Sequence, residues 1–134
     1  MIFKSYCLII LLCFVSFDAY AAQPISVSLA ECSVIYGVTS ITAEEKGKPE
    51  EQINAMRRMS EVFEDASYEQ AEAEGQSDGK AFIESRMQGL VDKWHERWLS
   101  DDHVKALSLM KENMEWVGYC GALGKDRGLL PLKR

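Results

Sequence analysis

Apolar residues recur at every third or fourth position along three long segments of the chain, and this spacing constrains the fold more than any other feature. Such a period places the apolar side chains on one face of an α-helix. The sequence therefore predicts three amphipathic helices, over about residues 50–74, 77–99 and 102–124, with these faces in the core. The apolar positions are Ile53, Met56, Met59, Phe63, Ala66 and Ala73, then Phe82, Met87, Leu90, Val91, Trp94 and Trp98, then Val104, Leu107, Met110, Met114, Val117 and Cys120.

Glycine, proline and short polar residues mark where these helices begin and end. Pro49 suits the first position of a helix, and Gly75 follows the end of the same segment. Polar residues at 77–78 and 100–102 precede the other two segments, where a side-chain oxygen can accept hydrogen bonds from the free amides of the first turn. Three glycines, Gly118, Gly121 and Gly124, are expected to unwind the last helix.

A further helix is predicted over residues 28–46, ahead of the other three. Ser28 and Glu31 have the spacing of a capping box, in which each side chain bonds to the backbone amide of the other residue. The segment is rich in β-branched residues, which also suit a strand, so a strand is the alternative here. Its apolar positions are Val27, Ile35, Val38 and Ile41.

The first 21 residues have the three parts of a secretory signal peptide. Lys4 precedes an apolar run over residues 7–17, and Ala19 and Ala21 occupy the positions read by a signal peptidase that cuts after Ala21. The run is about half the length of a membrane-spanning helix. We therefore predict a periplasmic or secreted protein in which 1–21 is cleaved, 22–124 forms a helical domain and 125–134 is a flexible basic tail. A cut after Ala22 is the alternative.

Two cysteines, Cys32 and Cys120, remain after this cleavage, because Cys7 and Cys13 lie in the signal segment. In an oxidising compartment such a pair is expected to form a disulfide. Short loops make consecutive helices antiparallel, which places the start of the first helix and the end of the last at one pole of a bundle. The predicted fold is therefore all-α, an up-down-up-down four-helix bundle with one disulfide joining the first and last helices.

The net charge of the chain is −6, and the predicted signal segment contributes nothing to it because Lys4 and Asp18 cancel. An acidic domain repels nucleic acid and anionic lipid, so neither is expected as a partner. No second segment of the sequence is as continuously apolar as residues 7–17, so no stable membrane anchor is expected after cleavage.

Motifs that resemble catalytic or metal sites fit structural roles better. Residues 75–79 spell G-x-S-x-G, but a nucleophile elbow needs a strand before the serine, and a turn between helices is expected here. His95, Asp102 and His103 lie near one interhelical turn and form the alternative of a metal site. Haem would need an axial methionine and histidine on facing helices, which this sequence does not offer. No enzymatic activity and no cofactor are expected.

The remaining interpretation is a small exported binding module that acts on one periplasmic protein. In size, export and helical content the chain resembles the helical immunity proteins and small periplasmic chaperones, and this resemblance implies an inhibitory or an escorting role. It transfers no site residue. A metal- or haem-binding four-helix bundle is the alternative function. Aromatic residues at the edges of the apolar faces are the candidates for a protein-binding surface, and they are Tyr68, Trp116 and Tyr119.

Overall fold

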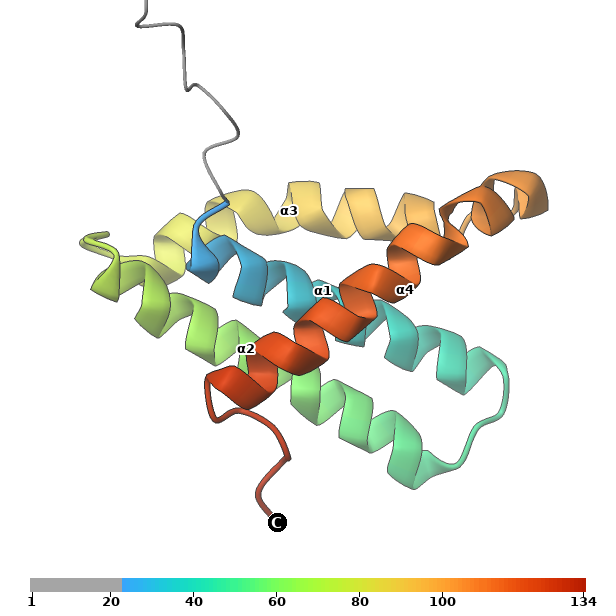
Figure 1. Ribbon diagram of the computed structural model, residues 1–134, viewed down its shortest axis with the longest axis horizontal. Helices are drawn as coiled ribbons and strands as arrows, with labels where there is room; N and C mark the ends of the chain where they lie inside the picture. The colour runs from blue at the N-terminus through green and yellow to red at the C-terminus, as the bar shows by residue number, and fades with distance from the viewer. Residues whose placement is uncertain (1–22) are drawn as a thin grey trace, which may run out of the picture.

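The computed structural model describes residues 23–134, and within them it contains four α-helices and no strand (Figure 1). The predicted all-α class is confirmed, and the first segment is a helix instead of a strand. The predicted signal peptide, residues 1–21, lies outside the described residues. The helices are α1 (Ile25–Glu45), α2 (Glu50–Ala73), α3 (Gly79–Trp98) and α4 (His103–Asp126).

Successive helices run in opposite directions, and α1 lies at the centre of the arrangement (Figure 1). α2 and α3 lie along α1, while α4 crosses α1 obliquely toward α2. Each loop between helices has only a few residues, which favours antiparallel neighbours. The up-down-up-down order is therefore as predicted, with the last helix tilted across the others.

The core forms around α1, in which every residue from Ser26 to Ile35 is buried. Large side chains from the neighbouring helices complete it, with Phe63 from α2 and Trp94 from α3 both fully enclosed. The β-branched residues of α1 are helical in spite of their preference for strands. The free energy gained by burying these side chains outweighs their lower helix propensity, which costs less than about 1 kcal/mol per residue relative to alanine.

The start of α1 differs from the predicted capping box. The helix begins at Ile25, so Ser28 and Glu31 lie inside it and do not cap it. The capping role belongs to Glu74, just after α2, whose carboxylate accepts hydrogen bonds from the amide of Ser26 at 3.0 Å and from its hydroxyl at 2.5 Å. A carboxylate at a helix N-terminus satisfies free amides and complements the helix dipole. The prediction of a capping box was wrong because the residue that caps α1 lies far away in sequence, just after the end of α2.

The end of α4 also differs from the prediction. The helix continues through Gly118, Gly121 and Gly124 and ends at Asp126. Two of these glycines, Gly118 and Gly121, face open space, and each costs about 1 kcal/mol of helix propensity relative to alanine. The chain instead turns at Gly128, which has a φ of 70°. The prediction was wrong because packing around this part of α4 outweighs the weak helix propensity of its glycines.

The C-terminal tail lies against the end of α4 and the core. A Cβ atom on Gly124 would lie 2.7 Å from atoms of both Leu130 and Phe63, so the tail and α2 approach this glycine closely. Leu129 and Leu130 pack against the core around Phe63. The expected flexibility of residues 125–134 remains a prediction.

The first half of α4 does not bury its predicted apolar face. Later residues of that face, Val117 and Cys120, do contact the core. Because α4 crosses α1 obliquely, its first half projects beyond the core and keeps its apolar side chains in solvent. Ile41 and Val91, also assigned to apolar faces, are exposed as well. The exposed fractions on α4 are 79% for Val104, 66% for Leu107, 50% for Met110 and 58% for Met114.

By length and composition α1 could cross a membrane, with a mean hydropathy of 1.4 over its most apolar window. In the bundle 72% of that window is buried, as expected of a central helix. The buried residues of α1 include polar ones such as Ser33 and Glu31, whose side chains bond to other helices.

Candidate functional site

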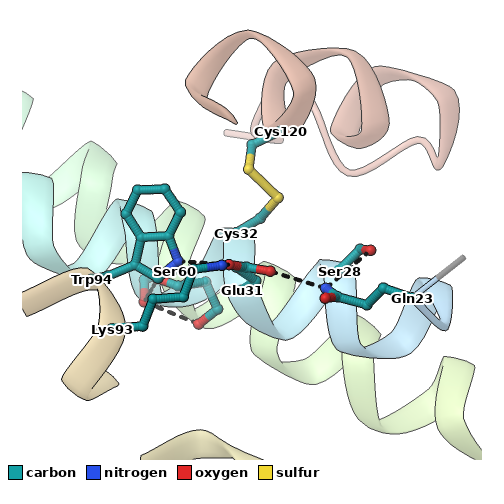
Figure 2. Close-up of a disulfide and its surroundings, with 9 residues drawn as sticks. Gln23, Ser28, Glu31, Cys32, Ser60, Lys93, Trp94 and Cys120 are labelled. Carbon is teal, nitrogen blue, oxygen red and sulfur yellow. Dashed lines mark hydrogen bonds and ion pairs between the residues drawn. A yellow bond between two sulfur atoms is a disulfide. The ribbon is translucent and has the colours of Figure 1, made fainter. Parts of the chain in front are cut away.

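The predicted bond between Cys32 and Cys120 is present (Figure 2). The two Cα atoms are 5.5 Å apart, and both side chains are fully buried. The bond attaches the second half of α4 to α1, so it holds the half of α4 that contacts the core. A buried disulfide of this kind is compatible with an oxidising compartment outside the cytoplasm.

A buried carboxylate, Glu31, lies directly beside this disulfide (Figure 2). It accepts hydrogen bonds from the indole nitrogen of Trp94 at 2.8 Å and from the side-chain amide of Gln23 at 2.9 Å. The ammonium of Lys93, which is partly exposed, forms an ion pair with it. A carboxylate can be enclosed in a core only when such partners replace its lost hydration. The network therefore holds α3 against α1 next to the disulfide.

An aromatic series leads from this network to the surface of α4. The ring centroids of Trp94 and Trp116 are 5.8 Å apart, and those of Trp116 and Tyr119 are 5.5 Å apart, both in edge-to-face geometry. The ammonium of Lys93 lies 5.2 Å from the centroid of the Trp116 ring. Contacts of both kinds contribute about 1 kcal/mol each beyond simple burial. Trp116 is thus held in place between the core and the surface.

Trp116 and Tyr119 line a shallow cleft between α4 and the start of α1. The cleft has a volume of about 510 Å³ and opens widely to solvent. Its other lining residues are Gln23, Ser28, Glu112 and Glu115. The structure therefore places two of the three predicted aromatic residues together, beside two carboxylates that the sequence analysis did not single out.

The third aromatic candidate, Tyr68, does not line this cleft. It lies on α2, where its ring packs against a small core cluster that contains Val27 and Ile83. Its hydroxyl donates a hydrogen bond to Glu64 one turn earlier. Burial and this bonded, negatively charged neighbour raise the pKa of Tyr68 well above its usual value. Its hydroxyl is already hydrogen-bonded within the protein, and its role in protein binding stays a prediction.

Of the three residues proposed as an alternative metal site, one has a structural role. Asp102 caps α4, accepting hydrogen bonds from the amides of Val104 at 3.0 Å and Lys105 at 3.1 Å. His95 and His103 are both exposed. Within residues 23–134 no three histidine, cysteine or acidic side chains gather closely enough to hold a metal ion. The G-x-S-x-G segment is a turn between α2 and α3, in which Asp78 caps α3.

The exposed apolar residues of α4 form a second candidate surface, on a neighbouring part of the same helix. Residues seven positions apart share a helix face, so Leu107 lies above Met114 just as Glu112 lies above Tyr119. Positions two apart, such as Glu112 and Met114, point in nearly opposite directions. The side chains of Val104, Leu107, Met110 and Met114 are called the α4 stripe below.

Sequence reasoning missed both the α4 stripe and the role of Glu31. The only signal for Glu31 was an acidic residue inside an otherwise apolar helix, and it was interpreted as a cap. Comparison of the chain with protein-family models, curated proteins and solved structures found no match.

Proposed function

We propose that this protein is exported and acts as a protein-binding module, with the α4 stripe as the surface that docks its partner. Two features support export. Residues 1–21 have the pattern of a cleaved signal peptide, and the bond between Cys32 and Cys120 is typical of an oxidising compartment.

The α4 stripe is the observation that carries the proposal. Four large apolar side chains, each at least half exposed, follow one another along three turns of a single helix. Burying such side chains against a partner would yield on the order of 1 kcal/mol each, which is enough to anchor an interface. Two of the four are methionines, whose flexible side chains adapt to the surface they meet. Exposed apolar patches of this kind typically mark sites of protein interaction.

Charge favours a basic protein partner over a second copy of this chain. Two copies would approach each other with a net charge of −6 each, which opposes association, whereas a partner of opposite charge would be attracted. Lys111 lies beside the stripe between Leu107 and Met114. If two copies paired through their stripes in antiparallel orientation, with Val104 of one copy opposite Met114 of the other, Lys111 of each copy would lie opposite Leu107 of the other. A charged side chain would then face an apolar one. The partner is therefore expected to present an apolar ridge and to carry a net positive charge.

Inhibition and escort are the two finer roles that fit such a module. An inhibitor would bind one enzyme or toxin in a long-lived complex with equal numbers of both proteins. A chaperone would bind its client only until the client is folded or delivered. For the alternative of a metal carrier, no three histidine, cysteine or acidic side chains within residues 23–134 gather as candidate ligands.

Site-specific cross-linking in the intact host cell tests the proposal. A photoreactive amino acid replaces Met110 in the full-length chain, and a matched control places it at Glu69, an exposed polar site on α2. We expect one defined cross-linked protein from position 110, its loss when Leu107→Glu is added, and no such product from position 69. A product with twice the mass of the chain would overturn the proposed basic partner in favour of self-association. Equal products from both positions would overturn the docking surface.

A further inference from the structure

The cleft beside Trp116 and Tyr119 combines aromatic rings with carboxylates. Tyr119 is 44% exposed, and its ring meets that of Trp116 edge to face at 5.5 Å. Glu112 and Glu115 line the same cleft, and Ser28 adds a hydroxyl from α1. Aromatic rings next to carboxylates are a typical environment for an organic cation, because ring faces and carboxylates both attract positive charge.

Trp116 already accepts one cation within the protein. The ammonium of Lys93 lies 5.2 Å from its ring centroid. The same ammonium is paired with Glu31, so its charge is compensated from inside the core. The Trp116 ring is therefore already in contact with an ammonium group inside the protein, and the charge of that group is balanced by Glu31.

The charges around the cleft leave one carboxylate uncompensated. Glu112 accepts a hydrogen bond from Arg97 at 2.8 Å and is paired with that guanidinium. Glu115 forms no ion pair with any residue in the described range 23–134. Of the two carboxylates that line the cleft, Glu115 is therefore the one left to pair with a cation, and it lies one helical turn before Tyr119.

We propose that this cleft binds an alkylammonium group, with Glu115 pairing with its charge while Trp116 and Tyr119 contact its methylene chain. The group could belong to a lysine side chain of a protein partner or to a free diamine or polyamine. The first source rests on the proposed function, because it would make the cleft a second contact of the same partner. The open shape and the single free carboxylate predict weak binding by the group alone, with a dissociation constant on the order of millimolar.

Titration of the purified chain followed by nuclear magnetic resonance tests this inference. The probes are cadaverine, spermidine and N-acetyl-lysine methylamide, and the neutral control is N-acetyl-norleucine methylamide. We expect the cationic probes to shift the indole signal of Trp116 and the ring signals of Tyr119. Glu115→Gln should weaken binding roughly fivefold, whereas the matched change Glu69→Gln on α2 should have no effect.

The result also separates the possible ligands. Tighter binding of the free amines by tenfold or more would assign the cleft to a small amine, and equal binding of the lysine derivative would assign it to a protein side chain. Shifts that are equally large with the neutral control, or unaltered by Glu115→Gln, would overturn the proposal. Tyr119→Leu is a second probe of the aromatic contact, at a half-exposed site where folding should be preserved.

The outcome of this titration is independent of the α4 stripe. Leu107→Glu lies eight positions before Glu115, about 12 Å along α4, and should leave the titration unchanged. Loss of the cross-linked partner with intact amine binding would contradict the proposed function alone. The reverse result would contradict only the cation site.

Discussion

Glu74 caps α1 although it lies 48 residues after Ser26 in the chain, because its carboxylate accepts hydrogen bonds from both the amide and the hydroxyl of Ser26. Burial raises the pKa of the Glu74 carboxyl. The hydrogen bonds from Ser26 and Gln70 and the charge of Arg127 outweigh this effect and hold the pKa below its usual value. The ionised carboxylate is therefore the form that stabilises the folded state.

Glu74→Gln is expected to lower stability at pH 7 by about 1 kcal/mol, a typical value for loss of a helix cap. The pKa of Glu74 is lower in the folded state than in the unfolded chain. The stabilisation that Glu74 provides is therefore fully present at pH values above its pKa in the unfolded chain, and it is lost as the pH falls through its pKa in the folded state. The difference in melting temperature between wild type and variant should thus narrow below about pH 4. Thermal melts from pH 7 to pH 3 measure this, with Glu69→Gln as control. A difference in melting temperature that stays constant from pH 7 to pH 3 would contradict the capping role.

Gly79→Ala should destabilise the protein by about 1–3 kcal/mol, because a Cβ atom at this position would lie 2.1 Å from the backbone oxygen of Tyr68. Backbone atoms cannot move aside as the end of a side chain can. Gly89→Ala is the matched control on the same helix, where nothing lies within 4 Å, and it should stabilise by up to about 1 kcal/mol. Urea unfolding of both variants measures the contrast. Equal effects would mean that α2 and α3 are not packed this closely.

Cys120→Ser should lower the thermal midpoint of the mature protein by about 10 °C or more. The bond closes a separation of 88 residues, for which chain entropy predicts a contribution of about 4–5 kcal/mol. The double variant Cys32→Ala, Cys120→Ala controls for effects of a free thiol and should melt at a similarly low temperature. An unchanged midpoint would show that the two cysteines are not bonded in the protein as purified.

Lys93→Met should destabilise the fold by about 2 kcal/mol, because it leaves the buried charge of Glu31 without its cation. Adding Glu31→Gln removes that charge and should restore part of the loss. The exposed pair of Lys80 and Glu84 provides the control, and Lys80→Met should change stability by less than about 0.5 kcal/mol. Chemical denaturation gives the unfolding free energies of the wild type and of these three variants. If the double variant is less stable than Lys93→Met alone, the charge of Glu31 is not the reason for the loss.

Leu107→Ser should change stability by less than about 0.5 kcal/mol, although its position in the helical period predicts a core residue. Ile83→Ala on α3, where the side chain is fully buried, should cost about 2–5 kcal/mol. Denaturant midpoints of the two variants compare them directly. A large loss for Leu107→Ser would place the first half of α4 in the core and would remove the α4 stripe as a docking surface.

The fold could be predicted from the sequence because its main signals are local or follow from the compartment. Helical periods, a proline before α2 and an aspartate at each of two caps defined the elements, and the predicted export identified the pair of cysteines. The cap on α1 could not be predicted in this way. It depends on Glu74, which only the completed bundle brings to Ser26.

The candidate surfaces were predicted less well, for a physical reason that α4 illustrates. The helical period predicts that Leu107 and Met114 share a face of α4, but it does not predict which part of that face contacts the core. The oblique crossing of α4 decides this, and it is set by long-range packing at Cys120 and Gly124. Trp116 and Tyr119 were identified as residues beside the apolar face, whereas their cleft also needed α1.

The complete burial of Cys32 and Cys120 has a consequence for the order in which the molecule assembles. An oxidant cannot reach two sulfurs enclosed in a packed core, so the bond must form before α4 has packed fully against α1. Once α4 has docked, small thiols are excluded in the same way, since exchange requires direct attack on a sulfur atom. Reduction then has to wait for α4 to open, which makes the lifetime of the bond a measure of how tightly that helix is held.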